Sequence, residues 1–292
     1  MFLWDNVSMT PANASVSVTT INVNGIRAAF RNGLTGWLEI AQPDVMLLQE
    51  VRAEEDIAQS LLGDSWHVFT YPSQLKGRAG VSIAVRKASK VVAPADAVPM
   101  RGLQDDEDAA HSGRWIELVL DTVSGEPIRV VSTYFHAGAL GTPKQDLKYE
   151  HLDAVSERLD ALSDEGKRSG IQTLVGGDFN VARQELDLKN WKGNHNKNAG
   201  ALDQEIEYLE RWRGKGWVDV VRELAGPRNG PYSWWSWRGR AFDNDAGWRI
   251  DYHYATESLA AHAHDFNVFR APSWDTRFSD HAPVTVNYRL GW

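Results

Sequence analysis

The sequence predicts an α/β fold in which strands outnumber helices. Short apolar or alternating runs, such as 15–21 and 128–135, have the period and length of strands and recur along the chain. Few stretches, chiefly 144–162 and 202–213, place apolar side chains at helical spacing. The strand pair 114–120 and 128–135 flanks a Ser-Gly turn, which indicates that much of the sheet is antiparallel.

The remaining elements follow from the same two periods. Gly33 and Gly36 weaken a helix over 26–40, and Pro143 marks the start of the helix over 144–162. The amide- and glycine-rich stretch 181–201 has no period, so we expect a long loop there. The further strands expected are 44–48, 66–70, 79–85, 90–93, 171–175, 249–255, 263–269 and 283–288, with a short acidic helix over 54–62 and an irregular loop over 95–113.

Composition bounds the classes of protein that this chain can be. The 292 residues are 42% hydrophobic and 24% charged, which suits a globular core, and no apolar run is long enough to span a bilayer. Residues 1–14 lack the basic and apolar regions of a signal peptide, so we expect a loosely ordered leader before a single domain over 15–292. The absence of cysteine excludes thiolate chemistry and fits a reducing cytoplasm.

Charge is distributed unevenly along the chain. The net charge of −8 argues against a protein covered in positive charge for non-specific nucleic-acid binding. Residues 71–90 nevertheless carry five cations and no acid, whereas acids cluster at 54–56 and 105–108. This separation is compatible with one phosphate-binding face, and equally with an ordinary solvated surface.

Polar side chains end several of the predicted strands. Asp178 and Asn180 follow the apolar run 173–175 after two glycines, which are expected to turn the backbone sharply where the strand ends. Alone, this is an ordinary turn. The same pattern recurs at strand ends across about 260 residues, in a set of nine polar residues: Asn22, Asn24, Glu50, Tyr134, Asp178, Asn180, Asp251, Asp280 and His281.

These nine side chains have the chemistry of phosphodiester hydrolysis. Carboxylate and amide oxygens suit a hard cation such as Mg²⁺ or Mn²⁺ better than zinc. No HExxH, GxxxxGK[ST] or GxSxG motif points elsewhere, and the pair His262 and His264 reads as surface histidines. Enzymatic hydrolysis of a phosphodiester requires that the activation barrier fall by on the order of 20 kcal/mol. One general base accelerates the reaction by roughly 10²–10⁴-fold, which is only a few kcal/mol, so a metal and fixed donors are needed as well.

Seven strings in register give the chain a family resemblance. They are INVNGIRA (21–28), LLQEVR (47–52), STYFHAG (132–138), GGDFNVA (176–182), YSWWSW (232–237), GWRIDYHYAT (247–256) and FSDHAPV (278–284). Together they resemble the exonuclease III and apurinic/apyrimidinic (AP) endonuclease family of the endonuclease/exonuclease/phosphatase superfamily. The resemblance implies a four-layered α/β sandwich, in which two mixed, mostly antiparallel sheets pack face to face with helices outside.

The resemblance also implies roles for the nine residues. Glu50 resembles the principal Mg²⁺ ligand, with Asn24 and Asp280 beside it on the metal side. Asp178 resembles the residue that activates or orients the attacking water. The other family positions contact or position the phosphate: Asn22 and Asn180 as amides, Tyr134 as a hydrogen-bond donor, and His281 with Asp251 as its orienting partner.

The aromatic stretch 232–248 bears on the substrate. Trp234, Trp248 and Ile250 fall where DNA-repair members line a pocket for a flipped-out abasic sugar, although buried core positions are the alternative. Ala137 stands where the family pattern has an amide, which puts one backbone contact in doubt. The roles of Arg78 and Arg238, at loop tips, stay open. Matching positions also suggest phosphate or DNA contacts for Arg27, Arg52, Lys148, Asn190, Asn194 and Asn198, the three asparagines lying in a loop that is alternatively plain and solvated.

The resemblance therefore implies a Mg²⁺-dependent DNA-repair nuclease, with Mn²⁺ as a possible substitute. Its substrate would be double-stranded DNA with abasic sites or blocked 3′ ends, cut 5′ to the abasic site or trimmed by 3′–5′ exonuclease and 3′-phosphatase activity. We expect a cytoplasmic monomer that does not bind membranes. The alternatives are a superfamily hydrolase acting on RNA, inositol phosphates or lipids, and an inactive binding relative; the intact set of nine residues speaks against the latter.

Overall fold

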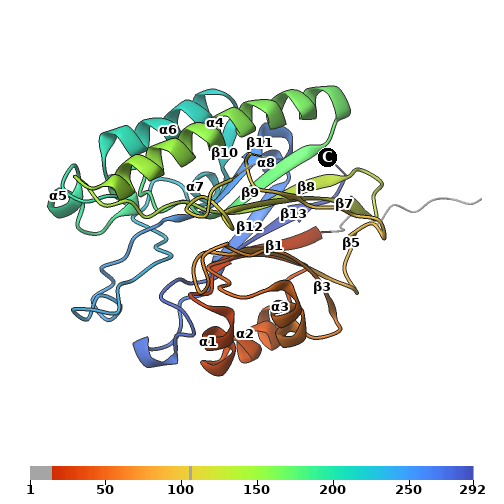
Figure 1. The fold of residues 1–292 in the computed structure, drawn as a ribbon, viewed down its shortest axis with the longest axis horizontal. Helices are drawn as coiled ribbons and strands as arrows, with labels where there is room; N and C mark the ends of the chain where they lie inside the picture. Colours follow the sequence, from red (N-terminus) through yellow and green to blue (C-terminus); the bar gives the residue numbers. More distant parts are fainter. Residues whose placement is uncertain (1–14, 105–106, 292) are drawn as a thin grey trace, which may run out of the picture.

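The computed structural model describes residues 15–104 and 107–291. The expected leader, 1–14, and two residues of the acidic run, 105–106, lie outside the described residues. Two β-sheets pack face to face, and helices cover both outer faces, which gives four layers (Figure 1). The predicted four-layered α/β sandwich is therefore confirmed.

The first sheet has the strand order β12-β13-β1-β2-β4-β3, and in it only β1 and β2 run parallel. Three short helices cover its outer face, at the bottom of Figure 1. The strands are β1 (Ser15–Asn22), β2 (Val45–Gln49), β3 (Trp66–Tyr71), β4 (Val81–Arg86), β12 (Ala263–Val268) and β13 (Val284–Arg289), and the helices are α1 (Ile26–Arg31), α2 (Leu34–Ala41) and α3 (Glu55–Leu62).

The second sheet has the order β10-β11-β9-β8-β7-β5, with β6 paired to β7, and its one parallel pair is β8 and β9. The long helices α4 (Pro143–Ser169) and α6 (Asp203–Gly214) cover it, at the top of Figure 1. Its strands are β5 (Val91–Val92), β6 (Met100–Arg101), β7 (Trp115–Thr122), β8 (Ile128–Tyr134), β9 (Gln172–Asp178), β10 (Trp217–Asp219) and β11 (Asp251–Thr256); α5 (Trp191–Asn194), α7 (Val220–Ala225) and α8 (Glu257–Ala261) lie in the connections.

The two glycines before Asp178 have a different role from the one expected. They do not turn the chain, because β9 continues through both of them to Asp178. A Cβ added at Gly176 would lie 2.5 Å from Leu47 Cδ1 of the facing sheet, and one at Gly177 would lie 1.9 Å from the Thr133 carbonyl oxygen. Glycine is needed most at Gly177, because the backbone of the neighbouring strand β8 leaves no room for a side chain, whereas Gly176 faces the end of a flexible side chain in the other sheet.

Three other expectations needed correction. The helix expected over 26–40 is two helices, because the chain breaks at Gly33, whose φ is +111°. The stretch 181–201 contains the short helix α5 as well as loop. The segment that forms β10 and α7 was not predicted, since three strand residues and six helical residues are too short to show a period.

Packing in the sandwich follows the alternation of the strands. One cluster of buried apolar side chains, including Leu47, Ile83, Val130 and Leu174, fills the space between the sheets. A second cluster joins the outer face of the second sheet to α4 and α6, and a third joins the first sheet to α1, α2 and α3. Among the described residues, no helix combines the length and apolar character needed to cross a bilayer.

Candidate active site

The topology brings strand ends from both sheets to one edge of the sandwich. The parallel pairs β1 with β2 and β8 with β9 end there, and β11 and β13, which run antiparallel to β9 and β1, begin there. Asp251, for example, pairs directly with Asp178. A cleft of about 390 Å³ opens at this edge, lined among others by Glu50, Tyr134, Asp178, Asn180, Trp234, Trp248, Ile250, Asp280 and His281.

The backbone at this edge is strained where the predicted residues stand. Asn24, Glu50 and Asn180 have φ of 47°, 48° and 52°, in the left-handed region that non-glycine residues rarely adopt. Such conformations persist only where the surrounding structure holds them, and they concentrate at functional sites. The strained backbone at these three residues therefore indicates that their side chains are held in position for function, at a cost in stability.

Asp178 lies at the centre of the hydrogen-bond network. Its Oδ2 accepts from Asn22 Nδ2 at 2.9 Å and from Asn180 Nδ2 at 3.2 Å, while Oδ1 accepts from the Asn180 backbone N–H at 2.9 Å. Asn22 uses its second amide hydrogen to reach Glu50 Oε1 at 2.9 Å. One buried amide thus fixes two carboxylates that come from different sheets.

Burial raises the pKa of Asp178 to about 7, and the nearby carboxylates of Asp251 and Glu50 act in the same direction, against His281 and Asn22. A carboxylate is stable in water but poorly solvated in a buried site, so its neutral form is favoured there. A group with a pKa near neutrality can both accept and release a proton at physiological pH. This is the property that a general base requires.

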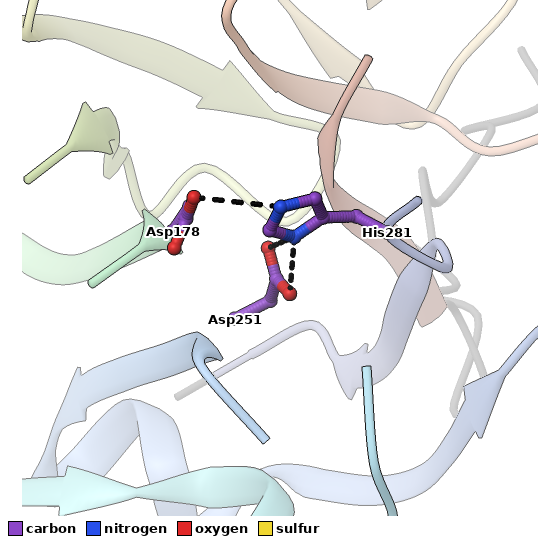
Figure 2. A group of neighbouring side chains, drawn as sticks. All are labelled: Asp178, Asp251 and His281. Atoms are coloured by element: carbon purple, nitrogen blue, oxygen red, sulfur yellow. Dashed lines mark hydrogen bonds and ion pairs between the residues drawn. The ribbon is translucent and has the colours of Figure 1, made fainter. Parts of the chain in front are cut away.

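His281 is held between two carboxylates, as Figure 2 shows. Its Nδ1 lies 2.9 Å from Asp251 Oδ2, and its Nε2 lies 3.7 Å from Asp178 Oδ2. Burial alone would lower the pKa of His281, but Asp251 and Asp178 outweigh it and raise the pKa to about 10. The imidazole is therefore cationic at neutral pH, with Asp251 fixing its orientation.

The donors at the mouth of the cleft fit a hard divalent cation. Glu50 and Asp280 supply carboxylate oxygens, and Asn24 Nδ2 donates to Asp280 Oδ1 at 2.9 Å. Asp178, Asp251 and His281 also bring possible ligand atoms within 4.8 Å of one another. In that second group the Asp251 carboxylate and His281 Nδ1 already bind each other. The oxygens of Glu50 and Asp280 have hydrogen-bond partners as well, so these two are assigned to the cation by their carboxylate chemistry and their place in the cleft.

Tyr134 lies in the cleft with an arginine against its ring. The guanidinium carbon of Arg114 lies 4.8 Å from the ring centroid, and its Nη1 donates to the Tyr134 carbonyl oxygen at 3.3 Å. Burial, together with the nearby Glu50 and Asp178, raises the pKa of Tyr134 well above its usual value. The phenol is therefore a neutral hydrogen-bond donor at any physiological pH.

An aromatic wall flanks the polar groups. Trp234 and Trp248 meet edge to face, with ring centroids 6.1 Å apart, and Ile250 packs beside them. Trp234 Nε1 donates to Asp280 Oδ2 at 3.0 Å, so the wall is tied directly to the candidate metal side. All three residues line the cleft, which is where a pocket for an abasic sugar would need them.

The structure contradicts the assignment of Lys148 as a phosphate contact. Its side chain is fully buried, and Nζ lies 2.7 Å from Glu205 Oε1 and donates to the Asn180 carbonyl oxygen at 2.9 Å. Glu205 in turn accepts from the Gly200 backbone N–H at 2.6 Å. Lys148 therefore braces the site from behind, and no phosphate can reach it in this conformation.

The remaining predicted DNA contacts divide into two groups. Asn194 and Asn198 line the cleft, whereas the exposed Asn190 does not and stands directly before α5 without a capping side-chain hydrogen bond. Arg27 is exposed on α1, and Arg52 is exposed but forms an ion pair with Glu50. Two of the three loop asparagines therefore line the cleft, and neither arginine is among its lining residues.

Three contributors were missed from the sequence. Arg114 supports Tyr134, Glu205 receives Lys148, and Ser233 Oγ donates to Asp251 Oδ2 at 2.6 Å. Ser233 stands in the matched string YSWWSW, which is a signal that could have identified it. Arg114 and Glu205 belong to none of the seven strings, so only the folded structure brings them to the site.

Known proteins are similar to this chain in sequence. The sequence pattern of the Endonuclease/Exonuclease/phosphatase family matches residues 19–281. An exodeoxyribonuclease of Bacillus subtilis (strain 168) is 33% identical over 266 residues, which cover 91% of this chain and 96% of that protein.

Solved structures agree with the sequence matches. An AP endonuclease from Archaeoglobus fulgidus superposes with a TM-score of 0.76 at 25% identity, over 94% of this chain and 99% of that one. A 3′ phosphatase from Neisseria, solved with a product DNA hairpin, gives 0.75 at 27% identity, over 95% and 100% of the two chains. The chain therefore belongs to the endonuclease/exonuclease/phosphatase family and, within it, to the exonuclease III and AP endonuclease group of nucleases.

Proposed function

We propose that this nuclease is a Mg²⁺-dependent DNA-repair enzyme that hydrolyses the phosphodiester 5′ to abasic sites and processes 3′ ends. The observation that carries the proposal is one cleft in which a buried carboxyl group with a pKa near neutrality faces a cationic histidine beside an aromatic wall. Residues 15–292 would act as one domain and as a monomer in the cytoplasm, and Mn²⁺ could replace Mg²⁺.

The polar half of the cleft would perform the hydrolysis. Asp178 takes a proton from the attacking water, and Asn22 and Asn180 position that water indirectly, because their amides hold the Asp178 carboxylate in place. His281, kept cationic by Asp251, donates from Nε2 to a phosphoryl oxygen, and the Tyr134 phenol donates to another. Glu50, Asp280 and Asn24 would hold the cation, which supplies further neutralisation of phosphoryl charge when bound.

The aromatic half would select the substrate. Trp234, Trp248 and Ile250 form an apolar surface next to the phosphate position, which suits a deoxyribose without a base. Asn194 and Asn198, which also line the cleft, would contact the DNA backbone. Two similar solved structures support this proposal, since one is an AP endonuclease and the other is a 3′ phosphatase bound to DNA.

The test is a set of matched duplexes that differ at one position. A 5′-labelled duplex with a single tetrahydrofuran abasic analogue is compared with an intact duplex and with a 3′-phosphate duplex, with Mg²⁺ and with EDTA. We expect incision at the analogue and removal of the 3′-phosphate, both lost in EDTA. Equal rates on RNA, inositol phosphates or sphingomyelin, with no preference for the analogue, would contradict the proposal.

The ligand assignment has its own test. Glu50→Gln should raise the Mg²⁺ concentration needed for half-maximal activity, and isothermal titration should show weaker Mg²⁺ binding. Glu54→Gln, an exposed glutamate of the same acidic segment outside the cleft, is the control. Unchanged Mg²⁺ affinity in Glu50→Gln would exclude Glu50 as a principal ligand.

A further inference from the structure

A second hollow lies beside the catalytic cleft and belongs to none of the site described so far. It measures about 290 Å³ and lies between the loop 236–243 and the turn η2 (Trp274–Thr276). Its lining includes Trp237, Arg240, Phe242, Trp274 and Arg277. In Figure 1 both segments, in two shades of blue, project from the same side of the molecule as α5.

Two exposed tryptophans distinguish this hollow from the rest of the described surface. Trp237 is 48% exposed and Trp274 is 53% exposed, whereas tryptophans such as Trp115, Trp212 and Trp217 are buried in the core. An indole exposed to water gives up the favourable burial of a large apolar surface. Two of them at one hollow therefore indicate a ligand with a flat, apolar face.

An arginine holds this pair of tryptophans in place. The guanidinium carbon of Arg277 lies 3.9 Å from the Trp237 ring centroid. Arg277 Nη1 donates to the Trp235 carbonyl oxygen at 2.9 Å, and Nε donates to the Trp274 carbonyl oxygen at 3.1 Å. Because one side chain contacts both segments, the hollow is formed in advance of any ligand.

The hollow is also connected to the catalytic edge. The Trp235 backbone N–H donates to the Asp280 carbonyl oxygen at 3.1 Å, and the neighbouring Trp234 lines the cleft. The loop that carries Trp237 is therefore anchored next to the cleft, and a strand of nucleic acid in the cleft would lie near the hollow. Arg238, exposed in the same loop, supplies positive charge for its phosphates, whereas Arg240 pairs with Asp243 of the lining, with Nε 3.5 Å from Oδ2.

We propose that the Trp237–Trp274 hollow binds one unpaired base of the DNA strand that occupies the cleft. Stacking on tryptophan suits any base, since every base has a π-face, and arginine adds cation–π attraction. The volume is near the lower limit of about 300 Å³ for small-ligand pockets, which admits one base and excludes a duplex. This inference rests on the proposed function, because it assumes that DNA occupies the cleft.

Binding to three abasic-analogue duplexes tests the inference, in an Asp178→Asn background that prevents cleavage. One duplex is blunt, one carries unpaired thymidines at both 3′ ends, and one carries them at both 5′ ends. We expect one tail polarity to lower Kd about tenfold relative to the blunt duplex, within the range given by stacking one base on an aromatic side chain. Fluorescence anisotropy measures each Kd.

Variants of the hollow decide the outcome. Trp274→Ala and Trp237→Ala should remove the gain from the tail without changing Kd for the blunt duplex, and Trp274→Phe should retain most of it. Val98→Ala, at a residue 86% exposed and outside both hollows, is the control. If Trp237→Ala fails to fold because Arg277 loses its stacking partner, Trp274→Ala, whose ring has no such stacked arginine, is decisive.

Two results would overturn the inference: no gain from either tail, or a gain that survives in Trp274→Ala. Failure of the proposed function gives a different pattern. In that case none of the duplexes binds, which would remove the basis for both proposals. Binding of tailed but not blunt duplexes would support the hollow and contradict the duplex specificity.

Discussion

Two clusters of buried charge lie on either side of Ile250, and they behave in opposite ways. In the first, Arg249 donates from Nε to Asp187 Oδ1 at 2.8 Å and from Nη2 to Asp219 Oδ2 at 2.7 Å. Arg222 Nη2 completes this cluster by donating to Asp187 Oδ1 at 2.5 Å. Each carboxylate here meets at least one guanidinium, and none of these side chains lines the catalytic cleft.

The second cluster, around Asp178, lacks this balance. Asp178 and Asp251 share one imidazolium and are otherwise held by neutral donors, while Glu50 pairs with the exposed Arg52. The effect shows in proton affinity: burial would raise the pKa of Asp187, but Arg249 and Arg222 outweigh it and lower that pKa. For Asp178 burial prevails and raises the pKa to about 7. In a matched buried cluster the loss of one partner destabilises the fold, whereas a buried carboxylate short of cations has a perturbed pKa, which is typical of functional sites.

The largest expected effect separates the two clusters by rate. Asp178→Asn should lower kcat by roughly 10²–10⁴-fold, since it removes the proposed base. The melting temperature should not fall, because an amide replaces a carboxylate that burial already disfavours. Single-turnover cleavage and thermal denaturation measure the two quantities. Near-normal turnover would refute the role of Asp178.

The matched change in the balanced cluster should act on stability instead. Asp187→Asn leaves Arg249 and Arg222 short of a counter-charge, and we expect a loss of about 3–5 kcal/mol in the free energy of unfolding. Urea denaturation measures this loss. If Asp187→Asn leaves stability unchanged, the distinction drawn between the two clusters fails.

The Lys148–Glu205 pair tests whether a balanced ion pair can also serve the site. Lys148→Met leaves Glu205 buried without its partner and removes a donor from the Asn180 carbonyl oxygen, so we expect a stability loss of about 3 kcal/mol. A fall in kcat at unchanged KM would show that Asn180 has moved.

The double variant Lys148→Met/Glu205→Gln supplies the control for that experiment. Because it removes both charges, it should be less destabilised than the sum of the two single variants. Additive losses would show that the two side chains do not interact as the structure indicates.

The smallest expected effect is a shift in pH dependence. His281 must carry a proton to donate to phosphate, and its pKa of about 10 keeps kcat/KM level between pH 8 and pH 9. Asp251→Asn removes a carboxylate that raises this pKa. As pH rises, His281 should then lose its proton earlier, and the alkaline fall in kcat/KM should begin at a lower pH than in the parent enzyme. Ser233→Ala, which removes only the hydroxyl on Asp251, should shift the profile less.

The elements with a sustained period were predictable from sequence alone. The apolar faces of 144–162 and 202–213 became α4 and α6, and the alternating runs became the strands of both sheets. The strand β10 and the helix α7 were not, because three and six residues are too few to establish a period, and Gly33 weakened the helix expected over 26–40 without showing that the helix breaks there. Recognition of the seven strings supplied the four layers, which periodicity alone does not specify.

The candidate site divides in the same way. The identities of its carboxylates, amides, tyrosine and histidine could be found from sequence, since each stands at the end of an apolar run. Only the tertiary structure decided that β9 continues through Gly176 and Gly177, that Lys148 points inward, and that Arg114 supports Tyr134. These features depend on distances between residues far apart in the chain, and local sequence carries residue chemistry but not such distances.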